Sequence, residues 1–221
     1  MAGKIITIDG PGGAGKTTVS RMLARRLGYT YVDTGSLYRG IALVALFSDC
    51  VENEERLKEL LKKVSLDFQP GEEGARLFLD GKDVSEDIRT PEISMLASRL
   101  SAKPIVREAL LEFQRKMAET GRAVFEGRDM GTVVFPCADR KFYLDAAHEV
   151  RARRRHEELK ARGLSTTFEA VSFEMLNRDV QDSTRLLAPL KPAADAVIMD
   201  SSNMTAAEVV ERMLGYMDDG T

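Results

Sequence analysis

Near its N-terminus the chain reads Gly10-Pro11-Gly12-Gly13-Ala14-Gly15-Lys16-Thr17. This stretch fits the pattern G-x-x-x-x-G-K-[ST], in which successive backbone N–H groups surround phosphate oxygens. An apolar run from Lys4 to Ile8 precedes it, and apolar residues follow it at helical spacing from Val19 to Leu27. A strand before and an amphipathic helix after are the context that the motif requires. The sequence therefore predicts a phosphate-binding loop; the alternative is a glycine-rich turn with a chance lysine.

The residue types in this loop indicate how a nucleoside triphosphate would bind. Lys16 can reach the β- and γ-phosphates, and the Thr17 hydroxyl can ligate Mg²⁺, while the start of the following helix adds positive potential. We expect the ATP phosphates to contact Gly10, Gly12, Gly13, Ala14, Gly15, Lys16, Thr17 and Thr18. The loop alone identifies no reaction. The sequence contains neither the Asn-Lys-x-Asp motif of GTPases nor an apolar strand ending in Asp-Glu, as in motor ATPases.

Outward from the loop, short apolar runs alternate with helical patterns. The strands that we expect are Lys4–Ile8, Tyr31–Val32, Ala123–Phe125, Lys141–Leu144 and Ala196–Met199. Strands that are joined by helical crossovers form parallel sheets with helices on both faces. The pattern therefore predicts an α/β fold of three layers around a five-stranded parallel sheet.

One segment breaks this alternation. Ser65 to Phe68 and Ala75 to Leu79 flank the turn Gly71-Glu72-Glu73-Gly74, and Gly81 to Asp83 can form a further extended piece. We therefore expect a small antiparallel insertion at about 65–90, followed by helices that begin at Pro91 and Pro104. The whole chain, 1–221, is expected to form a single domain.

Composition excludes several classes of protein. The chain has 221 residues, 43% of them hydrophobic and 30% charged, which is enough apolar material for a sizeable core. The net charge is −3, so no global basic field favours duplex DNA or other nucleic acid. Cys50 and Cys137 indicate reduced thiols in a cytosol. The N-terminus lacks a signal-peptide pattern, and no apolar run is long enough for a bilayer. We therefore expect a cytoplasmic protein with no membrane partner.

Arginines and aspartates follow two of the expected strands, where open α/β sheets bind ligands. Asp33 and Arg39 follow the second strand. Arg39 is placed to meet a second anion, and Asp33 could position Mg²⁺ waters or the incoming nucleophile. Alternatively, Asp33 or Thr34 caps a helix and Arg39 is solvated. Arg128 and Asp129 follow the strand at Ala123. They can face a ligand or form a surface ion pair.

The densest positive run is Arg151-Ala152-Arg153-Arg154-Arg155, in a helix that Gly163 can end. Arg151, Arg154 and Arg155 would share one face. We expect a lid at about 151–163 whose arginines close over transferring phosphates, on a helix with no strong apolar anchor of its own. The alternatives are a solvated face with ion pairs and an RNA-contacting patch.

A second helix carries Arg178, Asp182 and Arg185 on one face at positions i, i+4 and i+7. Ala188-Pro189-Leu190 follows them and stops the helix. The face is either a ligand site or an exposed, salt-bridged surface, and the spacing leaves both open.

Taken together, these motifs resemble the cytidylate kinase family of P-loop nucleoside monophosphate kinases. The matching stretches are Ile8 to Thr17, Asp33-Thr34-Gly35-Ser36-Leu37-Tyr38-Arg39, Gly127 to Pro136, Arg151 to Arg155, Arg178-Asp179 through Asp182-Ser183, Arg185 and Ala188-Pro189-Leu190. Their order extends over nearly the whole chain. The resemblance implies the P-loop NTPase fold and ATP-dependent phosphorylation of CMP and dCMP.

The resemblance also implies roles for individual residues. The phosphoryl transfer would depend on Lys16, Arg151, Arg154 and Arg155, with Mg²⁺ on Thr17 and, through water, on Asp33. The residues expected to bind CMP are Arg39, Arg128 and Arg185 at its phosphate, Tyr38, Arg178 and Asp182 along the sugar, Ser98, Arg107 and Asp129 at the cytosine, and Ser36. We expect a monomer. The competing hypotheses are a P-loop kinase for another small acceptor, such as shikimate, and a nucleotide-gated module that binds RNA.

Overall fold

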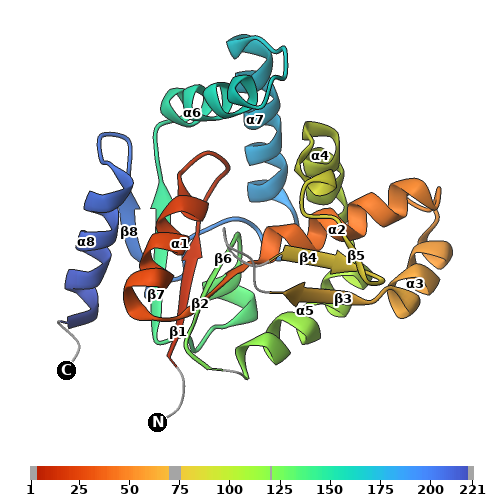
Figure 1. The fold of residues 1–221 in the computed structure, drawn as a ribbon, viewed down its shortest axis with the longest axis horizontal. Coiled ribbons are helices and arrows are strands. Elements are labelled where there is room, and N and C mark those ends of the chain that lie inside the picture. Colours follow the sequence, from red (N-terminus) through yellow and green to blue (C-terminus); the bar gives the residue numbers. More distant parts are fainter. Residues whose placement is uncertain (1–3, 70–75, 120, 219–221) are drawn as a thin grey trace. The chain divides into compact units, whose positions relative to one another are not determined.

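The computed structural model of the chain describes residues 4–69, 76–119 and 121–218 (Figure 1). The chain divides into two compact units. The phosphate-loop unit comprises Met1–Thr30 and Gly121–Thr221, and the inserted unit comprises Tyr31–Thr120. The chain therefore leaves the first unit after the helix that follows the phosphate loop, and returns to it ninety residues later for the rest of its length.

In the described part of the chain, the parallel sheet has five strands in the order β2-β6-β1-β7-β8. They are β1 (Ile5–Asp9), β2 (Thr30–Asp33), β6 (Ala123–Gly127), β7 (Arg140–Asp145) and β8 (Val197–Asp200). Asp9, the last residue of β1, pairs with Gly127 on one side and with Tyr143 on the other. The carboxyl ends of β1, β6 and β7 therefore lie close to one level. The predicted sheet is confirmed. β6, which lies between β2 and the central β1, is buried at all its residues, as a strand covered on both faces requires.

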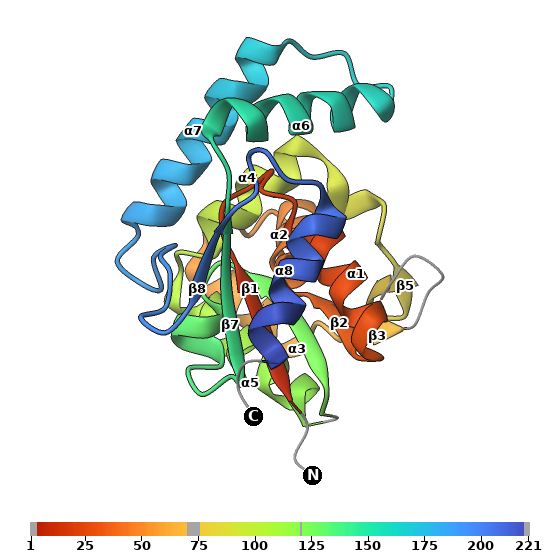
Figure 2. The ribbon, with the colours of Figure 1, turned by 90° about the vertical axis from the view of Figure 1, so that its left-hand side faces the viewer.

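Two pairs of helices accompany the sheet in the phosphate-loop unit. α1 (Lys16–Leu27) contacts β6 and lies beside α8 (Ala206–Asp218), as Figure 2 shows. α1 ends at Gly28, whose φ of 65° is the left-handed conformation typical of a helix C-terminus. α6 (His148–Ala161) and α7 (Phe168–Thr184) pack against each other as a helical hairpin. A short π-helix, Met130–Val134, follows β6.

The inserted unit contains helices and an antiparallel sheet. Its elements are α2 (Thr34–Phe47), α3 (Glu54–Lys63), β3 (Leu66–Gln69), β4 (Arg76–Leu79), β5 (Lys82–Asp83), a 3₁₀ turn (Asp87–Arg89), α4 (Pro91–Leu100) and α5 (Pro104–Ala118). β3, β4 and β5 pair antiparallel, which confirms the predicted insertion, although its turn at 71–74 lies outside the described residues. α3 was not predicted, although Asn53 caps it by accepting a hydrogen bond from the Arg56 N–H.

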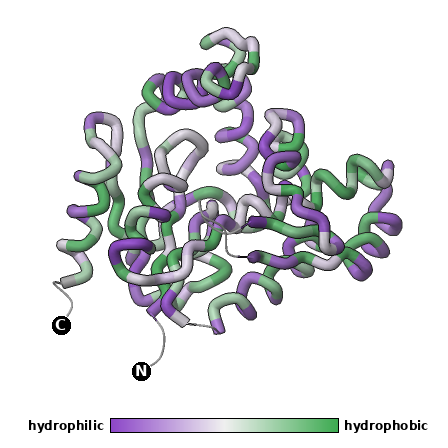
Figure 3. Tube along the Cα trace, in the orientation of Figure 1, coloured by the Kyte–Doolittle hydropathy of each residue, from purple (hydrophilic) through white to green (hydrophobic). Residues whose placement is uncertain are grey.

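The inserted unit has its own apolar core. α2 supplies Leu37 and Ile41, and Leu77 of β4 packs with them. Gly40 permits this approach, because a Cβ atom there would lie 2.8 Å from the Leu77 Cδ2. In Figure 3 hydrophobic residues are frequent in the strands of the parallel sheet, whereas α6 is largely hydrophilic. No helix among the described residues is both long enough and apolar enough to cross a membrane. The cytoplasmic location stays a prediction.

Candidate active site

The phosphate loop depends on glycine at two crowded positions. Gly10 has a φ of 147°, and a Cβ atom there would lie 1.9 Å from the carbonyl oxygen of Leu144. Gly13 has a φ of 74°, and its Cβ atom would lie 2.8 Å from the carbonyl oxygen of Arg151. Both conformations are strained for residues with side chains. The loop therefore packs closely against β7 and α6 while its backbone curves around the start of α1.

Lys16 occupies the first position of α1 and is buried. Its Nζ donates a hydrogen bond to the Pro11 carbonyl oxygen at 2.7 Å, across the loop. Burial and the nearby positive charge of Arg128 lower the pKa of the Lys16 ammonium from 10.5 to about 7. The loop therefore concentrates positive potential that a bound polyanion would compensate. Thr17 and Thr18 are exposed on the first turn of the same helix.

Two carboxylates at strand ends were missed by the sequence analysis. The Asp9 carboxylate accepts hydrogen bonds from the backbone N–H groups of Met130 and Gly131, each at 2.8 Å. Burial raises the pKa of Asp9 from 3.8 to about 6. Glu126 accepts a hydrogen bond from the Thr17 hydroxyl at 2.8 Å. Their position as polar residues at the ends of buried strands could have identified both.

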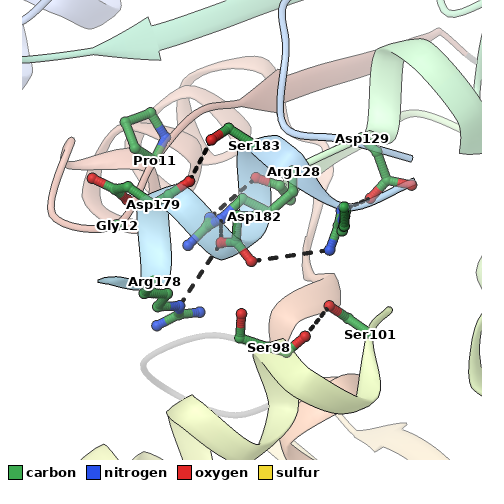
Figure 4. A network of polar contacts seen from close by, with 12 residues as sticks. Pro11, Gly12, Ser98, Ser101, Arg128, Asp129, Arg178, Asp179, Asp182 and Ser183 are labelled. Atoms are coloured by element: carbon green, nitrogen blue, oxygen red, sulfur yellow. Dashed lines mark hydrogen bonds and ion pairs between the residues drawn. The ribbon is translucent and has the colours of Figure 1, made fainter. Parts of the chain in front are cut away.

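Arg128, Arg178 and Arg185 converge on one buried carboxylate, Asp182. Figure 4 shows Arg128 and Arg178 beside it. Arg128 Nε donates to Asp182 Oδ2 at 3.0 Å, whereas the nearest nitrogens of Arg178 and Arg185 lie at 3.9 and 4.0 Å. Arg185 also lies 3.6 Å from an Asp129 oxygen. The side chains of Asp182 and Arg185 are 4% and 5% exposed, so this is no solvated helix face. The predicted face at i, i+4 and i+7 is confirmed as a cluster; below we call these five residues the arginine cluster.

The arginine cluster has a net charge of +1, because it contains three guanidinium groups and two carboxylates. Burial opposes ionisation of Arg128, but contact with Asp182 outweighs it and raises the pKa of Arg128. Arg185 Nε donates to the Ala188 carbonyl oxygen at 2.7 Å, and Ala188 has a left-handed φ of 48°. Such a φ costs a non-glycine residue about 1 kcal/mol. The turn after α7 therefore holds Arg185 in the arginine cluster, and the backbone of Ala188 is strained there.

The arginines of the α6 run do not form one solvent-exposed face, because they contact different partners. Arg151 Nη1 donates to the Gly12 carbonyl oxygen at 3.1 Å and to Asp179 of α7 at 2.6 Å. Arg154 donates from both terminal nitrogens to Ser201, which follows β8. Arg155 Nη1 pairs with Glu158 at 2.7 Å. Two of the three arginines therefore bind the surroundings of the phosphate loop, which the spacing along the helix did not indicate.

The expectation that this helix lacks an apolar anchor is wrong. Ala152 and Leu159 of α6 form a buried cluster with Val171 and Met175 of α7, and Phe168 packs against it. Two polar contacts also join the helical hairpin: His148 to the Ser172 hydroxyl, and His156 to the Thr166 carbonyl oxygen. The partners of the apolar residues lie about twenty residues further along the chain, so the pattern within α6 alone could not reveal them.

In the inserted unit, Asp33 caps α2 and holds Arg39. Its carboxylate accepts from the Ser36 N–H at 3.2 Å and from Arg39 Nη2 at 2.7 Å. The Ser36 hydroxyl donates to the Asp33 carbonyl oxygen. Arg39 is about four-fifths buried, and its Nε has no hydrogen-bond partner among the described residues. The capping hypothesis for Asp33 is therefore confirmed, whereas the suggestion that Arg39 is solvated is wrong.

Four further residues of the inserted unit meet where α4 ends and α5 begins. Arg107 of α5 donates to the Ser101 carbonyl oxygen at 3.3 Å and lies 5.9 Å from the centroid of the Tyr38 ring. The Ser101 hydroxyl donates to the Ser98 carbonyl oxygen at 2.7 Å, as Figure 4 shows. The unit therefore brings together three residues expected to bind the nucleoside, Tyr38, Ser98 and Arg107. Ser101 was not predicted.

Comparison with known proteins identifies the family. The family model for cytidylate kinase matches residues 6–219. The chain belongs to the cytidylate kinase family. The cytidylate kinase of Carboxydothermus hydrogenoformans is 46% identical over 210 residues, which cover 95% of each chain. That of Caldanaerobacter subterraneus subsp. tengcongensis is 49% identical over 211 residues, which cover 94% of this chain and 92% of the relative. The family resemblance is thus confirmed, and the protein is a nucleoside monophosphate kinase.

Solved structures agree on the fold. The shikimate kinase of Bacteroides thetaiotaomicron has a TM-score of 0.50 and 14% identity, over 98% of this chain and 99% of that one. The shikimate kinase of Acinetobacter baumannii has a TM-score of 0.50 and 15% identity, over 99% and 94%. At such low identity these matches show the P-loop kinase fold alone. They confirm the predicted fold class.

Proposed function

We propose that the protein transfers the γ-phosphoryl group of ATP to CMP and to dCMP. A phosphate oxygen of the acceptor attacks the γ-phosphorus in line with the leaving group, and the bond from that phosphorus to the β-phosphate oxygen breaks. The products are ADP with CDP or dCDP. Catalysis of this kind consists mainly of positioning and electrostatic stabilisation, since no covalent intermediate with the protein is needed.

The arginine cluster is the observation that supports the proposal best. A kinase for nucleoside monophosphates must hold a second phosphate besides those of ATP, and guanidinium groups match phosphate oxygens geometrically. Arg128, Arg178 and Arg185 are oriented by Asp182 within the unit that contains the phosphate loop. Their prior orientation lowers the entropy cost of binding. We propose that Arg128 and Arg185 bind the CMP phosphate together with Arg39.

On the ATP side, we propose that the backbone from Gly10 to Thr18 and the Lys16 ammonium bind the phosphates. Mg²⁺ fits the donors present, because it takes oxygen ligands, and the Thr17 hydroxyl and the Glu126 carboxylate lie 2.8 Å apart. When bound, the ion would neutralise charge on the β- and γ-phosphate oxygens. Asp33 is the weaker candidate, since Ser36 and Arg39 already engage its carboxylate. No cluster of three or more His, Cys, Asp or Glu residues capable of holding a metal occurs in the described part of the chain.

For the nucleoside, we propose that Tyr38, Arg178 and Asp182 contact the sugar and that Ser36 supports Tyr38 and Arg39 on α2. Cytosine presents an amino donor at N4 and acceptors at N3 and O2. Asp129 can accept from N4, Arg107 can donate to N3 and O2, and Ser98 can do either. Uracil reverses this pattern at N3 and at position 4. A site of this kind therefore rejects UMP because it leaves polar groups unpaired.

The arginines of α6 divide by their contacts. Since Arg151 already bridges Gly12 and Asp179, we propose that it braces the phosphate loop, while Arg154 and Arg155 stabilise the transferring phosphoryl group. The RNA-binding hypothesis loses support, because Arg151 is buried and Arg154 is held by Ser201, so the run does not present one exposed positive face. We propose a monomeric enzyme.

An acceptor panel tests the proposed function. With ATP and Mg²⁺ supplied, CMP and dCMP should be phosphorylated efficiently, UMP up to about 10⁴-fold less efficiently in kcat/KM, and AMP, GMP and shikimate negligibly. Arg107→Met and Ser98→Ala should lower the ratio of kcat/KM for CMP to kcat/KM for UMP, chiefly by loss of activity on CMP. Lys116→Met changes an exposed cation of the same helix α5 and is the matched control.

The panel has clear contradicting outcomes. Equal kcat/KM for UMP or AMP and CMP would overturn the proposed specificity. If Arg107→Met and Ser98→Ala both keep the full preference for CMP, the assignment of the base-reading residues is wrong. Turnover of shikimate in place of nucleotides would favour the competing acceptor.

A further inference from the structure

A buried serine at the end of β8 joins three parts of the phosphate-loop unit. Ser201 is 3% exposed and follows Asp200, which pairs with Asp145 of β7. Its N–H donates to the Asp145 carbonyl oxygen at 2.8 Å. The backbone of Ser201 is therefore fixed as a continuation of the sheet, whatever its side chain does.

The side chain of Ser201 connects the phosphate loop to α6. Its hydroxyl donates to the Ala14 carbonyl oxygen at 3.0 Å and accepts from Arg154 Nη1 at 3.1 Å. The Ser201 carbonyl oxygen accepts from Arg154 Nη2 at 2.7 Å. A serine hydroxyl has one donor and two acceptor positions, so the donor is used on the loop and an acceptor on the arginine. The planar guanidinium is held by two nitrogens at once.

We propose that Ser201 is a positioning residue for phosphoryl transfer: it orients Arg154 and polarises the phosphate loop. The proposal rests on the proposed function. Arg154 donates to a hydroxyl that itself donates to the loop, and hydrogen bonds in such a chain strengthen one another. The accepting carbonyl of Ala14 shares a peptide group with the Gly15 N–H. Polarisation of that carbonyl makes this N–H a stronger donor to a phosphate oxygen of ATP.

The neighbouring serine provides a contrast. The Ser202 hydroxyl donates to Asp200 Oδ1 and accepts from the Ala147 N–H, so it fastens the turn after β8 without touching the loop or Arg154. Ser202→Ala therefore removes the same atom, one residue away, and serves as the matched control. A purely structural role of Ser201 would predict that both substitutions act on stability alone.

The experiment compares the kinetics of Ser201→Ala with those of Ser202→Ala. Ser201→Ala should lower kcat/KM for ATP about tenfold, which corresponds to one or two hydrogen bonds that include a charged donor. The KM for CMP should stay within about twofold, and so should every kinetic constant of Ser202→Ala. Ser201→Cys keeps the packing but weakens both hydrogen bonds, so it should show the same selective loss even if the alanine variant folds poorly.

A double-mutant cycle tests whether Ser201 acts through Arg154. In an Arg154→Met background, Ser201→Ala should cost less than about threefold in kcat/KM for ATP. Wild-type kinetics in both Ser201 variants would overturn the proposal. So would an undiminished loss in the Arg154→Met background, or an equal loss toward ATP and CMP that follows a lower melting temperature. Failure of the proposed function would appear separately, as a wild-type protein that does not phosphorylate CMP.

Discussion

At the scale of single residues, the site combines buried charges with partners that orient them. Lys16, Asp9 and Asp182 are all almost inaccessible, yet each contacts a named donor or acceptor. Burial favours the neutral form of each group, and these contacts oppose that effect. The arginine cluster, with three guanidinium groups and two carboxylates, keeps an excess of positive charge where we propose that phosphates bind.

The lowered pKa of Lys16 predicts proton uptake when ATP binds. In the free protein the pKa of Lys16 is about 7, so the amine is mostly neutral at pH 8. The phosphates of ATP favour the charged form and raise this pKa. Binding at pH 8 should therefore take up close to one proton, and the affinity should fall as the pH rises above 7. Calorimetric titration in buffers of different ionisation enthalpy measures the uptake.

The control for this titration is Lys16→Arg, because a guanidinium stays charged throughout this pH range. That variant should bind ATP without proton uptake. The same uptake in both proteins would assign the proton to another group. No uptake in the wild-type protein would contradict the lowered pKa of Lys16.

At the scale of secondary structure, the helical hairpin of α6 and α7 connects the arginines beside the phosphate loop with the arginine cluster. α6 carries the arginines that contact the loop and Ser201, and α7 carries Arg178 and Asp182 and ends just before Arg185. The apolar contacts of Val171 and Met175 hold the two helices together. We therefore expect the hairpin to open and close as one body.

Val171→Ala tests this expectation. The substitution removes two methyl groups from a buried position, which should destabilise the hairpin locally by about 1–2 kcal/mol. Hydrogen exchange should accelerate throughout residues 148–184 and stay unchanged in α1 and β1. Val180→Ala, at a half-exposed position of the same helix, should leave exchange nearly unchanged. Faster exchange in α7 alone, with α6 unaffected, would show that the helices move independently.

At the scale of the whole molecule, the parallel sheet and the antiparallel insertion were predictable because their signals are local. Strands such as β6 begin with a continuous apolar run, and the phosphate loop has a fixed spacing between a strand and a helix. Glycines and prolines marked the ends of several helices. The exception was α3, whose short amphipathic pattern between Asn53 and Val64 was overlooked.

The partners of the charged residues were less predictable. Spacing along α7 predicted that Arg178, Asp182 and Arg185 lie together. They do, although Arg185 follows the end of α7 and contacts Asp182 from the turn. The bonds of Arg151 to Gly12 and of Arg154 to Ser201 connect residues 139 and 47 positions apart. The spacing of residues along one helix does not indicate contacts with such distant parts of the chain. The family resemblance indicated which residues are expected to bind the substrates, but not which contacts hold those residues in place.

The central claim is that this chain transfers the γ-phosphoryl group of ATP to CMP. The most direct test measures ADP formation from ATP and Mg²⁺ with and without CMP, with CDP identified as the second product. We predict that CMP raises the rate at least about a hundredfold over hydrolysis by water, because acceptor binding completes the site. Lys16→Ala should remove this activity while melting near the wild-type temperature. ADP formation that is independent of CMP, or that yields no CDP, would contradict the account.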